Sequence, residues 1–538
     1  MFEIFAFSII LSIKFLLFPT YHSTDFEVHR NWKAITTSLS IREWYFNDFS
    51  EWTLDYPPLF AYMELILGYI SKLFDPQITN IHNLYYSESL CKYFMRCTVL
   101  IGDIIFFLSM KKISKVLKIK KKFILLFISI EGFAGLVLID NIHFQYNGIL
   151  FGIFFMSIGY VINEEYIIGA ILFTICLCMK HIFLYMAPAY FIFYLKFVIF
   201  QDSKNFFEMI KKTIKIGCFI LLIIFLTFLP FIIISIKDRN LNQFIQIKER
   251  LFPFKRGLIH TYWAPNFWAI YSFLDKILYW KNKLNNINDD INKINNQNNI
   301  NIKKNTSTLG KTQETNFDVL PDISSKISNI IVLSNLLIYF VKNIFKDNKK
   351  NDKLSKGKIL IKYCLMSNLI FFNFGYHVHE KAFIIISLLS IVYFIISEKK
   401  DILTNFNFLF ILIGSLSQFP LIFQINEYLI KIGILLFYLI FSLCFLNNNE
   451  NKNILYKILI ISYILICLIL DFNNVFKEYI NNIKLSKENN SFGLGIFIEL
   501  LNKIQILNNR YPFLSLMCFS VLNAILTQII YFILLIFF

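Results

Sequence analysis

Residues 2–19 read FEIFAFSIILSIKFLLFP, an apolar run that carries only two charged side chains, Glu3 and Lys14. A helix needs roughly 20 apolar residues to cross a hydrocarbon core of about 30 Å, so this run predicts a membrane helix. Similar blocks recur along the 538-residue chain, in which 56% of residues are hydrophobic and only 17% are charged. Soluble domains carry about 25% charged residues, so the sequence predicts an all-α polytopic membrane protein.

We predict about 14 membrane-spanning helices, several of them short. After the run at 2–19, the expected spans lie at 93–110, 122–139, 148–162, 166–179, 182–200, 214–236, 327–345, 358–376, 382–398, 402–423, 428–446, 453–471 and 513–538. The first run has no basic segment before it and no small-residue cleavage site after it. It is therefore expected to remain as an anchor rather than to be removed as a signal peptide.

The net charge of +17 does not indicate nucleic acid as a partner, because the lysines are concentrated between the hydrophobic blocks. In such places they determine membrane orientation and contact anionic lipid, so the expected surroundings are membrane lipids. The nine cysteines are scattered and lie mostly inside apolar runs. They match neither a disulfide framework nor a zinc-binding spacing.

The densest basic segment, KKISKVLKIKKK at 111–122, is predicted to be cytosolic. The loop at 20–92 then lies on the opposite side of the membrane, as does DNIHFQYN at 140–147. If the aromatic block at 266–280 lies in the membrane interface instead of crossing, the basic loop at 346–358 is also cytosolic. HVHEK at 377–381 then lies on the far side as well. We choose this assignment of loops to the two sides of the membrane, which we call the chosen count.

Three parts are expected: an N-terminal module at 1–280, with membrane helices and a catalytic loop region, a low-complexity insertion at 281–326 without regular structure, and a C-terminal membrane module at 327–538. The glycosylation acceptor patterns at Asn305 and Asn489 both fall on the far side in the chosen count, which supports it.

Polar motifs gather at the far-side ends of the apolar runs, and clustered ionisable groups at membrane depth suggest a function. Asp25 follows the first predicted helix, where a carboxylate can be held in place and still contact water. A general base must be ionised and must reach the proton that it removes, so we predict Asp25 as the catalytic base. Alternatively, Asp25 caps the next helix, because TDFE fits the S/T-x-x-E capping pattern.

Arg30 or another nearby cation is expected to lower the pKa of Asp25. We assign Glu27 and Arg30 to positioning of this loop or of an acceptor, with a structural role favoured for Glu27. In LDYPPLF, two prolines exclude a helix and hold Asp55 and Tyr56 in place, although a simple loop-to-helix junction explains the pattern equally well.

His143, Gln145 and Tyr146 either contact a sugar or cap the span at 148–162. In HVHEK, the spacing of His377 and His379 differs from the i, i+4 pairs of helical metal sites, so we predict contact with a phosphate through these histidines and Lys381. Further cations expected at the donor are Lys180 and Arg256. There is no glycine-rich nucleotide loop or Walker motif, which argues against a nucleoside triphosphate donor.

Taken in order, the motifs TDFEVHRNWKAIT, TLDYPPLFAYME, MRCTVLIGDI, DNIHFQYNGILFG, RLFPFKRG and HVHEKA resemble the dolichyl-phosphate-glucose-dependent α-1,3-glucosyltransferases of the endoplasmic reticulum. The likeness runs from about Thr24 to Ala382 and excludes the insertion. It implies the GT-C glycosyltransferase fold, with lumenal loop helices beside the membrane helices. It also implies that Asp25 is the base and that His379 lies close to the donor phosphate.

The forms TDFEVHRNW and LIHTYWAPNFWAIYSFLDK resemble the branch of this family that adds a second glucose to the lipid-linked oligosaccharide. The implied donor is dolichyl phosphate glucose, the implied acceptor is a dolichyl-diphosphate-linked oligosaccharide that already carries one glucose, and no metal or other cofactor is expected. A β-linked donor and an α product require inversion. The implied site is the lumenal side of the endoplasmic reticulum membrane.

Two alternatives stay open. The sister enzyme that adds the first glucose shares most of the motifs. A glycolipid transporter would instead carry charge buried between spans in two similar halves, whereas charge in this sequence gathers at one set of span ends.

Overall fold

The computed structural model describes residues 2–118, 132–252, 257–259, 263–291, 317–346, 352–397, 406–445, 454–482, 503–509, 511 and 513–537. Helices dominate this part of the chain, and the single isolated β-bridge recorded in it pairs Ile259 with Val378. The predicted all-α class is therefore confirmed. Arg256 and the acceptor patterns at Asn305 and Asn489 fall outside the described residues.

The N-terminal elements are α1 (Phe2–Leu16), α2 (Thr24–Ser38), α3 (Pro58–Ser71), η1 (Pro76–Thr79), α4 (Ser89–Val116), α6 (Ala134–Val137), η3 (Leu138–Phe144), α7 (Asn147–Ile162), α8 (Tyr166–Met179), η4 (His181–Met186), α9 (Ala187–Phe193), η5 (Tyr194–Phe200), α10 (Phe206–Asp238) and α11 (Asn242–Leu251). Elements η3 and η5 are π-helical, whereas η1 and η4 are 3₁₀ helices. Helices α2, α3 and α11 lie in loops between predicted spans.

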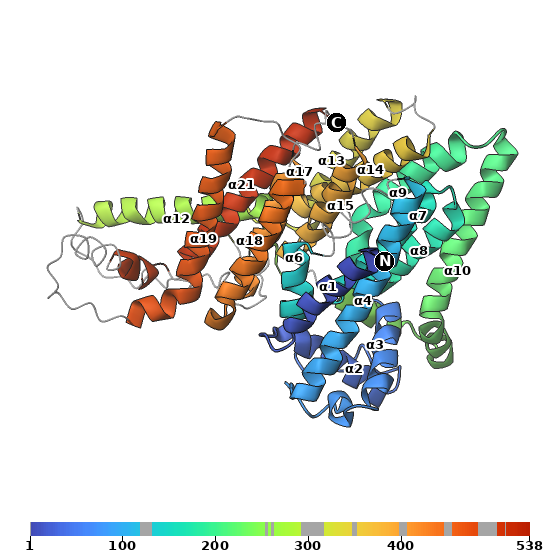
Figure 1. The fold of residues 1–538 in the computed structure, drawn as a ribbon, viewed down its shortest axis with the longest axis horizontal. Coiled ribbons are helices and arrows are strands. Elements are labelled where there is room, and N and C mark those ends of the chain that lie inside the picture. Colours follow the sequence, from blue (N-terminus) through green and yellow to red (C-terminus); the bar gives the residue numbers. More distant parts are fainter. Residues whose placement is uncertain are drawn as a thin grey trace.

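The C-terminal elements are α12 (Phe267–Ile291), α13 (Ser325–Lys346), α14 (Lys353–Phe374), η7 (Glu380–Ala382), α15 (Phe383–Ile396), α17 (Asn407–Leu416), η8 (Phe419–Leu421), η9 (Ile425–Glu427), α18 (Tyr428–Phe445), α19 (Ile454–Asn482) and α21 (Leu514–Phe537). Helix α12 continues past the expected end of the aromatic block at 280 and projects from the body (Figure 1). The predicted unstructured insertion thus begins inside a helix, and residues 292–316 of it lie outside the described part.

Seven helices in the described residues are long and apolar enough to cross a membrane, and shorter apolar helices accompany them. Helices α7 and α8 have only 16 and 14 residues, fewer than the roughly 20 that span a bilayer. The predicted number of about 14 spans includes several of these shorter apolar helices. In the most apolar stretch of α4 and of α10, half of the residues or fewer are buried within the protein, so the remaining residues are available for contact with lipid.

The predicted span at 182–200 is one continuous stretch but three helix types, namely η4, α9 and η5. Pro188 occupies the first turn of α9. Proline has no N–H to donate to the preceding turn, so the α-helix begins there and a tighter 3₁₀ segment precedes it.

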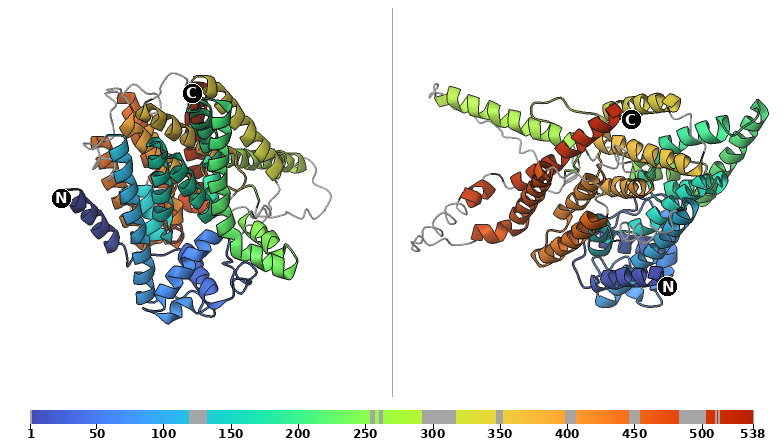
Figure 2. Two further views of the ribbon diagram at one scale, coloured as in Figure 1. Left: turned by 90° about the vertical axis from the view of Figure 1, so that its right-hand side faces the viewer. Right: turned by 45° about the horizontal axis from the view of Figure 1, so that its top comes forward.

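Helices α4 and α7 approach closely because glycines face each other across their interface. A Cβ atom on Gly102 would lie 2.8 Å from the backbone nitrogen of Ile149, and one on Gly152 would lie 2.9 Å from the nitrogen of Phe106. This contact holds the first turn of α7 and the segment before it against α4. Helices α2 and α3 lie below α7 and α8 and beside α4 in Figure 1, and the left view of Figure 2 shows them at the same end of the body.

The two groups of loops assigned to opposite sides of the membrane lie at opposite ends of α7. The π-helix and Gln145 precede its first residue, whereas its last turn leads to Glu164 and Glu165. Lys112 pairs with Glu165 at 3.1 Å, and Lys356 pairs with Glu164 at 3.5 Å. Both basic loops predicted to be cytosolic thus meet at one end, in agreement with the chosen count.

Candidate active site

Helix α2 begins directly after Ser23, whose hydroxyl accepts a hydrogen bond from the backbone N–H of Asp25 at 3.1 Å. Ser23 is therefore the N-cap, so the alternative that Asp25 caps this helix through a capping box starting at Thr24 is wrong. The backbone N–H and the hydroxyl of Ser23 both donate to the carbonyl oxygen of His143. Asp25 thus stands in the first turn of α2, tied to the end of η3.

Three side chains from two other segments meet on one oxygen of Asp25. Lys381 Nζ lies 2.6 Å from Oδ2, Gln145 Nε2 donates to it at 2.7 Å, and His143 Nε2 lies 3.3 Å away. The side chain of Asp25 is 21% exposed. All three contacts fall on Oδ2, and among the described residues none bonds to Oδ1. The arrangement leaves one carboxylate oxygen available to a substrate.

The same neighbours determine the charge of Asp25. Burial disfavours the carboxylate, but the Lys381 ammonium and the His143 ring outweigh it and hold the pKa of Asp25 well below its usual range. The N-terminal turn of a helix also favours negative charge. Asp25 is therefore ionised at neutral pH, as a base must be, and the cation that pairs with it is Lys381 rather than Arg30.

Gln145 links Asp25 to a second group of polar side chains, which consists of Asn147, Asp140 and Lys180. Gln145 Oε1 accepts from Asn147 Nδ2 at 2.9 Å, and Asn147 Nδ2 also donates to Asp140 at 2.8 Å. Lys180 Nζ donates to Asn147 Oδ1 at 3.2 Å. The side chain that accepts from the first turn of α7 is that of Asp140, whose Oδ2 accepts from the backbone N–H of Gly148 at 2.8 Å, and not that of Gln145 or His143. Both instead contact the candidate base.

Lys180 connects this network to the segment before α3. Its ammonium lies 5.0 Å from the centre of the Tyr56 ring, and Asp55 adds a nearby negative charge. Burial and the repulsion from Lys381 lower the pKa of Lys180 to about 8. The rings of Tyr56 and His181 meet edge to face at 6.5 Å. The structure thus brings Asp55, Tyr56 and Lys180 together beside the candidate base.

Glu27 and Arg30 form a buried pair on α2. Arg30 Nε and Nη2 donate to the two carboxylate oxygens of Glu27 at 2.7 and 2.6 Å. Arg30 Nη1 also donates to the carbonyls of Ile78 and Asn80 at 3.1 and 3.3 Å. The pair therefore holds the loop around η1 against α2.

Tyr146 belongs to a second buried cluster under α2. Lys33 Nζ donates to its hydroxyl at 2.9 Å and to Glu64 at 2.6 Å, while His29 Nδ1 lies 2.7 Å from the other oxygen of Glu64. Thr98 lies 2.7 Å from the Tyr146 hydroxyl. Tyr146 is therefore buried and does not face a substrate. The sequence patterns do not indicate a role for Lys33 and Glu64 in supporting the candidate site, although both residues lie inside the quoted motifs.

The HVHEK segment lies beside Gly257, the last residue of FPFKRG, and Leu258. His377 N–H donates to the carbonyl of Leu258, and His377 Nδ1 lies 3.0 Å from the carbonyl oxygen of Gly257. Half-buried His379 immediately precedes η7, which carries Lys381, and its ring lies 5.5 Å from that of His377. The chain therefore places His379 two residues from the cation that contacts Asp25.

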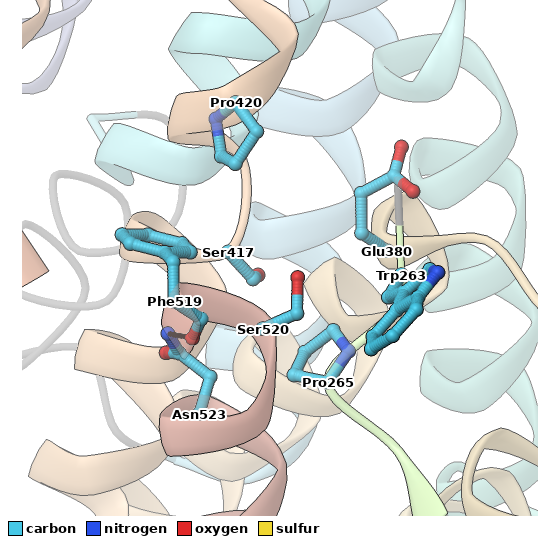
Figure 3. A pocket seen from close by; sticks show the side chains of 8 residues that line it. All are labelled: Trp263, Pro265, Glu380, Ser417, Pro420, Phe519, Ser520 and Asn523. Carbon is cyan, nitrogen blue, oxygen red and sulfur yellow. Dashed lines mark hydrogen bonds between the residues drawn. The ribbon is translucent and has the colours of Figure 1, made fainter. Parts of the chain in front are cut away.

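A separate cavity of about 10 Å³, which is room for about one water molecule, lies beside this segment (Figure 3). Its lining comes from the 263–265 stretch, η7, the α17–η8 region and α21: Trp263, Pro265, Glu380, Ser417, Pro420, Phe519, Ser520 and Asn523. Typical ligand pockets measure about 300–1,000 Å³, so this one does not hold a glycolipid. It separates η7 from the C-terminal helix.

Within the described residues, no group of three or more His, Cys, Asp or Glu side chains could hold a metal ion. The expectation that the reaction uses no metal or cofactor stays a prediction.

The model of the ALG6, ALG8 glycosyltransferase family matches residues 10–535. The chain belongs to this family. The predicted family and the GT-C fold are therefore confirmed, and this family member is a multi-pass membrane glycosyltransferase.

Relatives from animals and fungi cover most of the chain. The mouse protein is 39% identical over 463 residues, which are 82% of this chain and 81% of the mouse protein. The bovine protein is 36% identical over 95% of this chain and 91% of its own length, and the Schizosaccharomyces pombe protein is 37% identical over 78% and 79%. All three are named dolichyl pyrophosphate Glc1Man9GlcNAc2 alpha-1,3-glucosyltransferase.

Proposed function

We propose that this family member transfers glucose from dolichyl phosphate glucose to Glc1Man9GlcNAc2 on dolichyl diphosphate, or to a shortened equivalent, and forms an α-1,3 linkage with inversion. The names of its relatives support the acceptor and the linkage. The observation that carries the chemistry is the contact of Lys381 with Asp25 at 2.6 Å. It joins an ionised carboxylate of the first loop to the cationic HVHEK segment in one site.

Asp25 is the proposed general base. The acceptor hydroxyl donates to Oδ1, the oxygen without a described partner, and its own oxygen attacks C1 of the glucosyl donor. The proton passes to Asp25 as the new C–O bond forms, and the bond from C1 to the phosphate oxygen breaks with its electron pair on dolichyl phosphate. A base on the attacking side and charge stabilisation on the leaving side are what inversion requires.

The negative charge on the leaving phosphate is stabilised by cations on the side of the sugar opposite to the base. In inverting glycosidases the two catalytic groups lie about 6.5–9.5 Å apart. One ammonium reaches two oxygens at most about 5.6 Å apart, since each contact is about 2.8 Å. The sequence predicted Lys381 as a phosphate contact, but because it already lies 2.6 Å from Asp25 we propose that it holds the base. The phosphate contacts are then His379, Lys180, His377 and Arg256. A phosphate leaves without a general acid, and no metal is required.

We further propose that the site faces the lumen of the endoplasmic reticulum. The polar motifs lie at the end of α7 opposite to Glu164 and Glu165, where the basic loops gather. Basic loops favour the cytosolic side, so Asp25 lies on the lumenal side. The lipid tail of the donor then stays in the membrane while the oligosaccharide approaches from the lumen.

The experiment that tests the function offers dolichyl phosphate glucose and two acceptors to the purified protein. We expect elongation of the acceptor that already carries one glucose. Elongation of only the unglucosylated acceptor would instead assign the chain to the first-glucose step. Movement of a glycolipid between leaflets without glucose transfer would indicate a transporter.

The role of Asp25 has its own test. Asp25→Asn keeps the size of the side chain and removes the base. We expect turnover to fall by at least about 10²–10⁴-fold, the usual contribution of a general base, while folding and donor binding persist. Turnover close to that of the unmodified protein would exclude Asp25 as the base.

A further inference from the structure

Arg96, on α4, is a buried cation that the proposed chemistry does not use. Only 2% of the residue is exposed. Its two terminal nitrogens donate to the hydroxyl of Thr20 and to backbone carbonyls of two separate segments: Leu17, Thr20, Tyr21, Asn141 and Ile142. One guanidinium therefore joins the end of α1 to the end of the π-helix η3.

These carbonyls need such a partner. Asn141 and Ile142 lie in the last turn of η3, which ends at Phe144, and the last four carbonyls of a helix lack internal bonds. Thr20 and Tyr21 lie in the partly buried loop after the end of α1 at Leu16, where buried backbone carbonyls also need a donor. A guanidinium presents its donors in a rigid planar fork, whereas an ammonium offers only three donors around one nitrogen. Lysine at this position could keep the charge but not the full set of contacts.

The two segments that Arg96 joins both lead into the candidate active site. Tyr21 precedes Asp25 by four residues, and Ile142 directly precedes His143. Between these points, Ser23 donates twice to the carbonyl of His143. Any slip of one segment along the other would therefore alter the contacts of the Asp25 carboxylate with His143 and Gln145.

Glu427 holds the same segment from the C-terminal module. Its Oε1 accepts from the backbone N–H of Tyr21 at 2.7 Å, while Arg96 Nη2 donates to the carbonyl of Tyr21 at 2.8 Å. The ring of Tyr21 also meets Phe423 edge to face at 5.6 Å. Both polar groups of the Tyr21 backbone are thus held by buried charged side chains from opposite halves of the chain.

We infer that Arg96 is a positioning residue for the transfer reaction: together with Glu427 it clamps Tyr21 and so sets the place of the Asp25 carboxylate relative to Gln145 and His143. This inference rests on the proposed role of Asp25 as the base. Misplacement of a reacting group by about 1 Å can cost about 10²-fold in rate, so the clamp affects the chemical step as well as the fold.

Arg96→Lys in the full chain tests the clamp. We expect kcat per folded molecule to fall by about 10–100-fold, with little change in the KM for dolichyl phosphate glucose. The acidic limb of kcat/KM should also move to higher pH, because a displaced Asp25 loses part of the contact with His143 that favours its ionised form.

Two variants at Glu427 form a matched pair. Both Glu427→Gln and Glu427→Ala remove a buried negative charge, but only glutamine keeps an oxygen for the Tyr21 N–H. We expect Glu427→Gln to retain most of the kcat and Glu427→Ala to lose it. Equal kcat in the two variants would overturn the inference even if Arg96→Lys does not fold.

Asp471→Asn is the control for loss of stability alone. Asp471 pairs with Lys431 at 2.6 Å inside the C-terminal module, so the substitution should lower the melting temperature without changing kcat or the pH profile. An Arg96→Lys protein that behaves like this control would show that Arg96 serves only the fold. A protein that transfers no glucose to either acceptor, or keeps turnover in Asp25→Asn, would instead reject the proposed function.

Discussion

Asp25 and Lys381 are separated by 356 residues, yet the Lys381 ammonium lies 2.6 Å from Oδ2 of Asp25. The contact is half-buried, with side-chain exposures of 21% and 18%. A charge pair in such a place is screened less than one at the surface. Lys381 is therefore the cation best placed to control the protonation of the candidate base.

Removal of that cation should change the pH dependence of the reaction. Lys381 lowers the pKa of Asp25, so Lys381→Met raises it, and protons then compete for the base at a higher pH. Because kcat/KM reports the free enzyme, its acidic limb should move to higher pH. The measurement is a kcat/KM profile for the donor from pH 4 to pH 8, with Lys381→Arg as the matched control that keeps the charge.

The same profile separates the two roles considered for Lys381. If the residue only bound the donor phosphate, Lys381→Met would raise the donor KM equally at all pH values. An unmoved acidic limb would therefore contradict the pairing of Lys381 with the base.

Titration of Lys180 should make the donor KM depend on pH on the basic side of neutrality. Its pKa is lowered to about 8 by burial and by Lys381, so the ammonium loses its proton as the pH rises through that value. If Lys180 contacts the donor phosphate, the donor KM rises above pH 8. Lys180→Arg stays charged and should remove this rise, provided that the larger side chain fits.

Below pH 8, where Lys180 is charged, Lys180→Met should raise the donor KM by about tenfold or more, since a hydrogen bond to a charged group contributes about 1.5–3 kcal/mol. Equal donor KM values for Lys180→Met and the unmodified protein at pH 7 would remove Lys180 from the donor site.

Much of the fold follows from apolar block length alone. The predicted span at 166–179 coincides with α8, and the span at 428–446 differs from α18 by one residue. The short helices α2 and α11 could not be found in this way, because their residues are only partly apolar and their helical form depends on packing. Helix α3 is apolar but has only 14 residues, too few for a span. Nor could the break in 181–200 be inferred from hydropathy, since it arises from a single proline.

The motifs identified the segments of the site but not the partners within it. The motifs contain Asp25, Gln145 and Lys381, yet nothing in their spacing indicates that they meet on one oxygen. Arg30, the nearest cation in sequence, pairs with Glu27 instead. In an α-helix, residues three apart lie on the same face, so this local pair was the more predictable one. Contacts across 120 or 356 residues require the assembled fold.

Loss of the Glu27–Arg30 pair should destabilise the loop around η1. Glu27→Gln leaves the Arg30 guanidinium buried without a counter-charge, and breaking a buried pair costs about 3–5 kcal/mol. The exposed pair of Arg42 and Asp238 offers a control, because surface pairs contribute about 0–1 kcal/mol. Thermal unfolding of Glu27→Gln and Arg42→Met in detergent compares the two. Similar melting temperatures would contradict a structural role for Glu27.

Two glycines allow a direct test of the contact between α4 and α7. In Gly102→Ala the new Cβ would lie 2.8 Å from the backbone nitrogen of Ile149, a distance that real Cβ atoms do not adopt, so the helices must separate. Gly217, inside α10, has nothing within 4 Å of its Cβ position, and Gly217→Ala should stabilise that helix by up to about 1 kcal/mol. We expect a lower melting temperature and reduced glucose transfer for Gly102→Ala, because α4 and α7 carry Arg96 and the segment next to Gln145. An unchanged melting temperature in Gly102→Ala would show that this close contact does not support the site.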